Sequence, residues 1–313
     1  MNKYIPFVYN PVIRDYKRKL TYYLKSNHQD VVISLGGMET YFLTTVNDGS
    51  KKILWFHFAF DISRTFSDEL YKGWKSKLVY WIQTTRRVYH ARKFDKMIVL
   101  SQADLATWNK YVNNAIYIYN PVTIEKPLLA ELSNHRAIAV GVLGVQKGFD
   151  YLIDAWKLVN EKHPSWTLDI FGEGPDRSKL QAQIDNNGLR NVVILRGRTN
   201  SIVSEYANHS FFILSSRAEG FGLVLVEASI CGLPLVSFAC KQGPSEIIQD
   251  GVNGFLVNEV GDIKTLADKI NILIEDENLR KIMGRNALLK SQKFSYEVIR
   301  PQWLKVLNNI IDD

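Results

Sequence analysis

The second part of the chain alternates short apolar runs with helical stretches. Apolar runs bounded by turn residues predict strands at 137–143, 166–171, 191–195, 211–215, 233–238 and 254–257. The segments between and after them predict helices at 151–160, 177–186, 201–208, 223–230, 263–275 and 277–291. This alternation indicates a doubly wound parallel sheet, which binds ligands beyond the carboxyl ends of its strands.

The first part is less regular but alternates in the same way. Strand-like runs occur at 31–35, 53–58, 97–100 and 116–119, and helical patterns at 12–25 and 68–93. We therefore expect a second, smaller α/β unit. The stretch 120–134 contains Pro121 and Pro127, and we take it as the linker between the two parts.

Composition supports two folded domains and excludes a disordered or membrane-spanning chain. The chain has 313 residues, of which 46% are hydrophobic. It contains no apolar run of about 18 residues. Residues 1–9 lack the apolar region of a signal peptide, and two cysteines fit a reducing compartment. We expect a cytoplasmic protein.

The charge is unevenly distributed along the chain. Residues 1–122 hold 18 Lys and Arg against 9 Asp and Glu, a balance of +9. Because the whole chain carries +7, the remainder carries −2. Such a basic region suggests a polyanionic partner, namely nucleic acid, an anionic membrane or a phosphorylated acceptor. A solubilising surface is the alternative.

The segment 215–232 (SSRAEGFGLVLVEASICG) carries the most informative chemistry. A predicted strand ends there, a loop with Gly220 and Gly222 follows, and a helix begins near Leu223. Glycines allow close backbone approach, and the free amides of a helix start favour a phosphate. Glu219 and Glu227 flank this loop, and carboxylates accept hydrogen bonds from hydroxyl groups. The combination points to a nucleotide sugar.

Three other features leave alternatives open. Lys147, between a strand and a helix, is either a cation for a diphosphate or a solvated lysine. His57 is either a packed aromatic neighbour or a functional residue at a strand end. The segment 68–93 mixes aromatic and basic residues, as an interfacial membrane helix or a core helix with a basic solvated side would.

The sequence lacks the patterns of several other enzyme classes. It has no Walker A sequence, no Gly-x-Ser-x-Gly elbow, no Asp-x-Asp pair and no His/Cys cluster with ligand spacing. A metal or a cofactor is therefore not expected.

The stretch AEGFGLVLVEASICGLPLV resembles the signature of glycosyltransferase family four, the group 1 glycosyltransferases. Glu219 and Glu227 match the two glutamates of that family's E-x7-E motif. Three further segments are similar to parts of these enzymes, including those of capsule, lipopolysaccharide and exopolysaccharide synthesis: VGVLGVQKGFDYLIDAW, GPSEIIQDGVNGFLV and WFHF, the last resembling the segment of the active-site histidine.

The resemblance implies the GT-B fold, with two Rossmann-like doubly wound parallel-sheet domains facing a cleft and a shortened N-terminal domain. It implies an acceptor-side domain at 1–122, completed by a helix at 295–313, and a donor-binding domain at 123–294. By the same resemblance, roughly two βα units of the family would be missing before Val31.

The resemblance also assigns roles to the candidate residues. Glu219 would contact the donor sugar, Glu227 the ribose, and His57 the sugar pocket. The donor diphosphate would be held by Lys147, by the amides of Gly220, Phe221, Gly222 and Leu223, and by Arg198 or Arg217. One of these arginines would replace the family's usual arginine at position 142, where this chain has Val142.

The implied activity is the retaining transfer of a hexosyl or N-acetylhexosaminyl group from a nucleotide sugar, with UDP favoured. The acceptor would be a saccharide or a lipid-linked saccharide in cell-surface polysaccharide synthesis. The basic first part suggests peripheral attachment at the inner face of the plasma membrane. Alternatives are a catalytically impaired partner subunit and a nucleotide-sugar epimerase or hydrolase of the same fold; a nucleic-acid partner is not expected.

Overall fold

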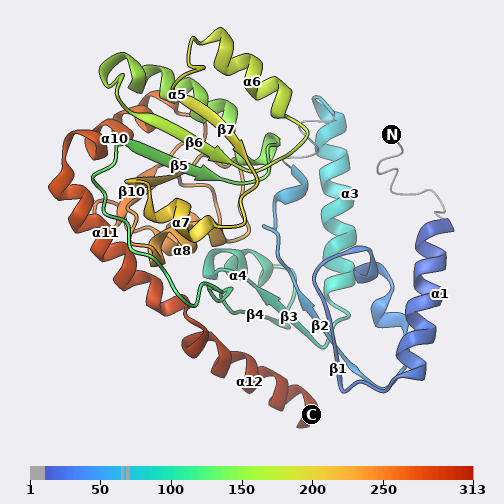
Figure 1. The fold of residues 1–313 in the computed structure, drawn as a ribbon. Helices are drawn as coiled ribbons and strands as arrows, with labels where there is room; N and C mark the ends of the chain where they lie inside the picture. Colours follow the sequence, from blue (N-terminus) through green and yellow to red (C-terminus); the bar gives the residue numbers. More distant parts are fainter. Residues whose placement is uncertain (1–10, 65–66, 68–70, 313) are drawn as a thin grey trace. The chain divides into compact units, whose positions relative to one another are not determined.

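The computed structural model describes residues 11–64, 67 and 71–312 of the chain. These residues form two compact units, which are both present in Figure 1. Unit 1 runs up to Tyr119 and resumes at Arg300, whereas unit 2 spans Asn120–Ile299. The boundaries expected from the sequence, after residue 122 and before residue 295, lie a few residues from these limits. The end of the chain therefore belongs to the same unit as its first part.

Among the described residues, unit 2 is built on a six-stranded parallel sheet in the order β10-β9-β8-β5-β6-β7. The strands are β5 (Arg136–Val140), β6 (Thr167–Phe171), β7 (Val193–Gly197), β8 (Phe211–Leu214), β9 (Leu235–Phe238) and β10 (Gly254–Val257). The chain moves outward from β5 to β7 and then returns to place β8 on the other side of β5. The loops after β5 and β8 consequently diverge at a topological switch point, where such sheets bind ligands.

Helices cover both faces of this sheet. They are α5 (Phe149–Lys162), α6 (Arg177–Asn186), α7 (Ile202–Ala207), α8 (Leu223–Ile230), α9 (Pro244–Ile247), α10 (Ile263–Glu275) and α11 (Glu277–Ser291), with short 3-10 turns η3 (Val145–Lys147) and η4 (Gln292–Phe294). Helices α5, α6 and α10 share one buried cluster with Phe211 and Ile213 of β8. Tyr206 of α7 instead packs on Phe212, which points to the opposite face. The expected doubly wound arrangement is confirmed.

Unit 1 contains a four-stranded parallel sheet in the order β1-β2-β3-β4 among the described residues. The strands are β1 (Val31–Ser34), β2 (Lys51–Trp55), β3 (Lys96–Val99) and β4 (Ala115–Tyr117). The surrounding elements are α1 (Pro11–Ser26), η1 (Met38–Tyr41), η2 (Leu43–Thr45), α3 (Trp74–Ala91) and α4 (Gln102–Trp108). Their core includes Leu54, Met97 and Trp108, which are fully buried. Unit 1 is thus a second α/β unit with a smaller sheet.

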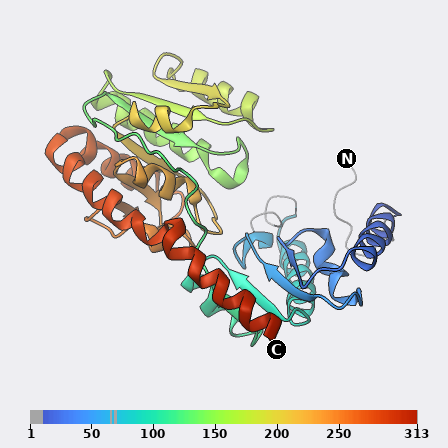
Figure 2. The same ribbon diagram turned by 60° about the horizontal axis from the view of Figure 1, so that its bottom comes forward.

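The last helix, α12 (Tyr296–Asp312), leaves unit 2 and ends in unit 1. It runs beside β4 in Figures 1 and 2. Trp303 of this helix packs edge-on against Trp55 of β2, with the ring centroids 4.6 Å apart. The sheet of unit 1 is therefore covered by a helix from the far end of the sequence.

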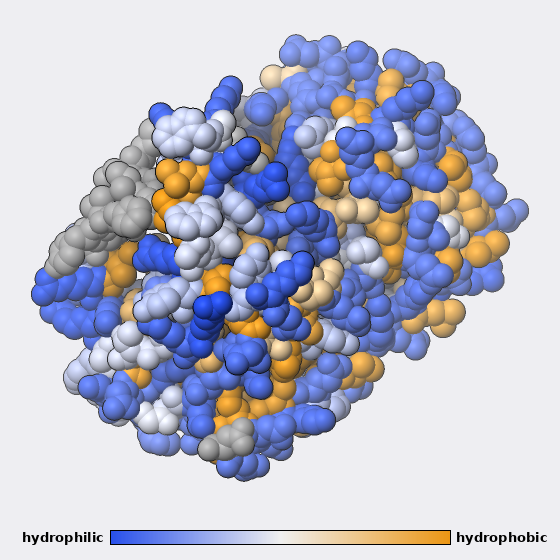
Figure 3. Space-filling model, turned by 180° about the vertical axis from the view of Figure 1, so that it is seen from behind, coloured by the Kyte–Doolittle hydropathy of each residue, from blue (hydrophilic) through white to orange (hydrophobic). Residues whose placement is uncertain are grey.

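Two expectations for unit 1 are wrong. The helix expected at 68–93 begins only at Trp74, because the positive φ of Gly73 (+65°) is not a helical conformation. Residues 68–70 of the expected helix lie outside the described residues. The strand expected at 53–58 ends at Trp55. Within the described ranges, no helix is long and apolar enough to cross a membrane. On the face seen in Figure 3, hydrophilic side chains cover most of the surface and hydrophobic ones lie among them in small groups.

Candidate functional site

The loop that carries Glu219 follows β8 and leads into α8. Ser215 and Ser216 at its start are buried, as is Glu219. Gly222 adopts the left-handed conformation at φ +88° immediately before the helix, and none of the described side chains caps the first turn. Backbone N–H groups of a first turn have no partner within their helix. The amides of Leu223 and Val224 can therefore bind an anion, favoured by the helix dipole, whereas the Leu225 amide donates to the Gly222 carbonyl at 2.8 Å.

Lys147 and Glu219 form an ion pair across the switch point. Lys147 lies in η3 after β5, and its side chain crosses Gly141, where a Cβ would lie 3.1 Å from the lysine methylenes. The Lys147 Nζ donates to Glu219 Oε1 at 2.7 Å, and Ser216 Oγ donates to the same oxygen at 2.5 Å. The side chains are 19% and 7% exposed, respectively. Two candidate residues are thus held in direct contact.

The two loops are joined along their backbones. A Cβ on Gly148 would lie only 2.1 Å from the carbonyl oxygen of Ser215, so only glycine permits this approach. Ser215 Oγ donates to the Lys147 carbonyl at 2.9 Å, and the Arg217 amide donates to the Gln146 carbonyl at 2.8 Å. The Gln146 side-chain amide donates back to the Ala218 carbonyl at 2.9 Å. These bonds fix Lys147 relative to Glu219.

Arg217 has a role in this junction that limits its use as a ligand. Its guanidinium makes a bidentate pair with Asp150, at 2.8 and 2.6 Å, and lies over the Tyr151 ring. Burial raises the pKa of Asp150, but the bonds from Arg217 outweigh it and lower that pKa overall. Val142, where the resemblance leads one to expect an arginine, is 61% exposed. The ammonium of Lys147 is the cation nearest to Glu219.

Glu227 lies one turn into α8 and is held by a neighbour on α7. Tyr206 is fully buried, and its hydroxyl donates to Glu227 Oε2 at 3.0 Å. Burial raises the pKa of Glu227, while the bond from Tyr206 opposes that rise. The carboxylate is therefore fixed through one oxygen, which leaves Oε1 as an acceptor for a ligand hydroxyl.

The side chain of Phe221 serves packing, whereas its backbone belongs to the loop. Phe221 is 2% exposed and its ring meets that of Phe294 edge-on at 5.3 Å. Gly243, after β9, has φ +92°, and a Cβ there would lie 2.2 Å from the Phe221 carbonyl oxygen. The loop after β9 thus supports the Gly220–Leu223 segment from behind.

Two further candidate residues lie on other elements, Arg198 in unit 2 and His57 in unit 1. Arg198 follows the edge strand β7 and is exposed, with no ion pair to any described side chain. His57 follows β2 in unit 1, with its ring 4.4 Å from that of Trp55. Its Nε2 is buried and has no hydrogen-bond partner among the described residues, and burial lowers its pKa. His57 is therefore neutral near pH 7.

Sequence reasoning missed three residues of the cluster. Ser216 donates to the same Glu219 oxygen as Lys147, and Tyr206 donates to Glu227. Gly148 permits the close contact between the two loops. Gly148 was visible as a glycine between a strand and a helix. Ser216 and Tyr206 carry no local signal, since their partners are defined only by the fold. No group of three or more His, Cys, Asp or Glu side chains suited to a metal occurs within the part of the chain that the structure describes.

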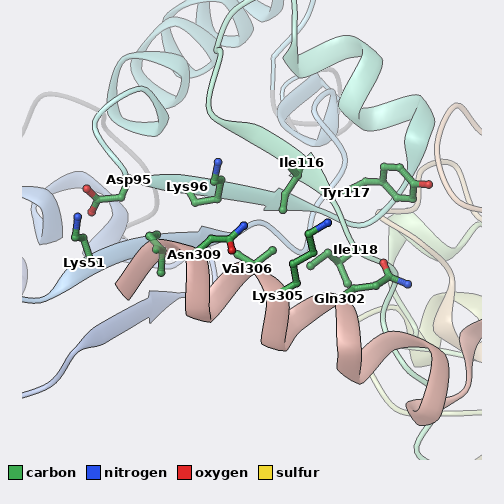
Figure 4. Close-up of a pocket in the computed structure, with 11 residues that line it drawn as sticks. Lys51, Asp95, Lys96, Ile116, Tyr117, Ile118, Gln302, Lys305, Val306 and Asn309 are labelled. Carbon is green, nitrogen blue, oxygen red and sulfur yellow. The ribbon is translucent and has the colours of Figure 1, made fainter. Parts of the chain in front are cut away.

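A cavity of about 520 Å³ lies elsewhere, between the sheet of unit 1 and α12 (Figure 4). Lys51, Lys96 and Lys305 are among its lining residues. Lys51 and Lys96 are the first residues of β2 and β3, so this part of the cavity lies at the amino ends of the strands. It contains none of the candidate residues. The switch point of unit 2 is the better candidate for chemistry, because ligands bind such sheets at the carboxyl ends.

Comparison with known proteins assigns the family. Residues 123–290 match the family described as glycosyl transferases group 1. An uncharacterized glycosyltransferase of Haemophilus influenzae is 30% identical over 312 residues, covering 98% of this chain and 84% of that protein. The amylovoran biosynthesis glycosyltransferase AmsD of Erwinia amylovora is 30% identical over 227 residues, or 68% of this chain and 62% of AmsD.

A solved structure supports the same assignment. A mutant of S. aureus TarM in complex with fondaparinux, alpha-GlcNAc-glycerol and UDP matches with a TM-score of 0.80 at 27% identity. The match covers 92% of this chain and 58% of TarM, so the chain spans less than two thirds of TarM and of AmsD. The expected GT-B fold is confirmed. Because the family match covers more than half of the sequence and the Haemophilus protein matches nearly all of it, the chain belongs to the group 1 glycosyl transferases.

Proposed function

We propose that the chain transfers a sugar from a UDP-sugar to a saccharide or lipid-linked saccharide, with retention of the anomeric configuration, in polysaccharide synthesis. The observation that carries this proposal is the partly buried Lys147–Glu219 pair beside the uncapped start of α8. These groups offer a cation, a carboxylate and backbone amides within one switch-point loop cluster. A diphosphate joined to a hydroxylated sugar matches that set of partners.

The roles of the residues follow from their charges. Negative charge grows on the leaving diphosphate as the glycosidic bond breaks, and Lys147 with the amides from Gly220 to Leu223 would stabilise it. Glu219 would accept hydrogen bonds from the sugar hydroxyls, and Glu227 would accept them from the ribose through its Oε1. The expectation that no metal or cofactor takes part rests on this cation and on these amides.

The names of the relatives support the choice of donor and pathway. TarM was solved with UDP, and AmsD acts in the synthesis of amylovoran. A poly(ribitol-phosphate) alpha-N-acetylglucosaminyltransferase of Staphylococcus aureus is 31% identical over 225 residues, which cover 71% of this chain and 45% of that enzyme. We propose UDP as the carrier and a hexosyl or N-acetylhexosaminyl group as the cargo.

We further propose that His57 lines the sugar pocket from unit 1 and that the protein works at the inner face of the cytoplasmic membrane. A neutral imidazole suits a hydrogen bond to a sugar hydroxyl, because one ring nitrogen donates and the other accepts. The basic balance of residues 1–122 suits an anionic membrane or a phosphorylated acceptor.

The test is a UDP-release assay with a panel of UDP-sugars and oligosaccharide acceptors, with the product anomer read by NMR. We expect Glu219→Gln to lower turnover by at least 100-fold, an effect typical of a lost transition-state contact. The control is Glu161→Gln, an exposed carboxylate on α5. Unchanged turnover in Glu219→Gln, or a product of inverted configuration, would contradict the proposal.

Two outcomes would replace the proposal by another function. UDP binding by calorimetry without turnover on any acceptor would favour an impaired partner subunit. Conversion of the UDP-sugar without any acceptor would favour an epimerase or a hydrolase.

A further inference from the structure

Helix α3 presents a row of large apolar side chains to solvent. Trp74 is 70% exposed, Leu78 45%, Trp81 63% and Tyr89 55%. At about 100° per residue these four positions fall within an arc of roughly 80° on one helix face. We call these four residues the α3 stripe. Exposed tryptophans at helical spacing are an uncommon surface feature and indicate a partner.

The other side of α3 attaches the helix to unit 1. Ser76, Val88 and Ala91 are buried. The Arg87 guanidinium donates to the Phe60 carbonyl at 2.6 Å, and the Tyr80 hydroxyl donates to Asp61 at 2.7 Å. The tryptophans therefore do not belong to the core. One side of α3 thus packs on the core of unit 1, as a core helix would, while the aromatic side chains of the opposite side are solvated together with the basic ones.

Basic residues border the stripe at both ends. Lys72, Lys75 and Lys77 are exposed around Trp74, and Arg92 and Lys93 are exposed beyond Tyr89. The sequence of α3 contains no Asp or Glu. Tryptophan and tyrosine prefer the level of lipid headgroups, and lysines and arginines are attracted to anionic lipids.

A second basic helix packs on the same segment of unit 1. The ring centroids of Tyr16 in α1 and Phe42 are 5.5 Å apart. The guanidinium carbon of Arg86 in α3 lies 4.1 Å from the ring centroid of the adjacent Tyr41. Helix α1 exposes Tyr22 and Tyr23, at 75% and 57%, and three consecutive basic residues at 17–19. Both helices therefore combine exposed aromatic rings with positive charge.

We propose that the α3 stripe is the surface by which this protein docks on an anionic lipid bilayer. The tryptophan rings enter the headgroup layer, and the bordering lysines contact lipid phosphates. The positive charge around the stripe favours an anionic bilayer over a second copy of this chain, because two copies of the stripe would bring lysines of like charge together. This inference rests on the proposed function only for the lipid-linked acceptor, which it would bring to the enzyme.

The experiment is flotation of the full chain with vesicles of phosphatidylcholine alone or with 30% phosphatidylglycerol, a composition on the order of natural anionic membranes. We expect flotation with the anionic vesicles at low salt, and a blue shift of tryptophan emission. The variant Trp74→Ser/Trp81→Ser should lower the bound fraction at least tenfold. The matched control is Leu289→Ser/Leu304→Ser, which removes two exposed leucines from α11 and α12.

Three results would overturn the proposal. They are absence of flotation at low salt, equal flotation of the tryptophan variant, and a concentration-dependent dimer that this variant abolishes, which would make the stripe an interface between copies. Transfer to a soluble oligosaccharide separates the two proposals. The tryptophan variant should keep that activity, whereas Glu219→Gln should lose it and still float.

Discussion

Gly148 is the position at which the loop junction can be tested most directly. Alanine there adds one methyl group, and its Cβ would lie 2.1 Å from the Ser215 carbonyl oxygen. Gly188, after α6, provides a matched control, because it has a similar φ of +71°, against +61° for Gly148, and nothing lies within 4 Å of its Cβ position. Both variants incur the cost of a left-handed alanine, about 1 kcal/mol.

The difference between the variants measures the close approach. Real Cβ contacts stay beyond 3.0 Å, so the Ser215 carbonyl must move by about 0.9 Å (3.0 − 2.1). Such a shift lengthens the three hydrogen bonds at 2.8–2.9 Å that join residues 146–147 to residues 215–218 beyond bonding distance. At about 0.5–1.5 kcal/mol each, Gly148→Ala should lose roughly 1.5–4.5 kcal/mol more than Gly188→Ala.

The assay is urea unfolding followed by hydrogen exchange on peptides of unit 2, because a two-unit chain need not unfold in one step. Calorimetric titration with UDP gives the second readout, and we expect weaker binding only in Gly148→Ala, since Lys147 shifts with its neighbour. Equal destabilisation of the two variants, with equal UDP affinity, would refute the reasoning.

Three further outcomes are expected. Tyr206→Phe removes the bond that opposes the raised pKa of Glu227, so that pKa rises further. UDP affinity should fall, most at the acid end of a titration from pH 8 to pH 5, with KM rising more than kcat falls. Burial raises the pKa of Asp169, but bonds from His209, Arg196 and Arg136 hold it well below its ordinary value, so this stability is present above pH 4 and is lost toward lower pH. Asp169→Asn should therefore unfold about 3 kcal/mol more easily at pH 7, and the deficit should shrink toward pH 3 in urea titrations. Lys147→Met should weaken UDP binding at least tenfold by calorimetry, and equal affinity would remove the lysine from the site.

The sequence predicted unit 2 better than unit 1, for physical reasons. In unit 2, every residue of β8 and β9 is buried, so β8 reads as a continuous apolar run and β9 as an apolar run interrupted only by Ser237. The bounds of α6, α8, α10 and α11 match the prediction. In unit 1 the turn residues between elements are less distinct, and α4 was not predicted. Its signal was the cap Ser101, whose Oγ accepts from the Asp104 amide at 3.1 Å.

The site could be predicted in part. The loop with Glu219, the helix start and Glu227 are contiguous in sequence, so local rules found them. The pair of Lys147 with Glu219 joins residues 72 positions apart, and only the return of the chain to β5 brings them together. Tyr206 was invisible for the same reason, since its partner is set by the packing of α7 beside α8.

The path of α12 has a consequence for how the protein is made. Residues leave the ribosome from the N-terminus, and domains commonly fold as they emerge. Most of unit 1 is synthesised before unit 2, yet the face of its sheet at Trp55 is covered by Trp303, which follows unit 2 in the chain. Unit 2 is complete before that moment. Unit 1 is therefore largely translated before unit 2 but completes its fold after it, because the face of its sheet at Trp55 stays exposed until α12 has been synthesised.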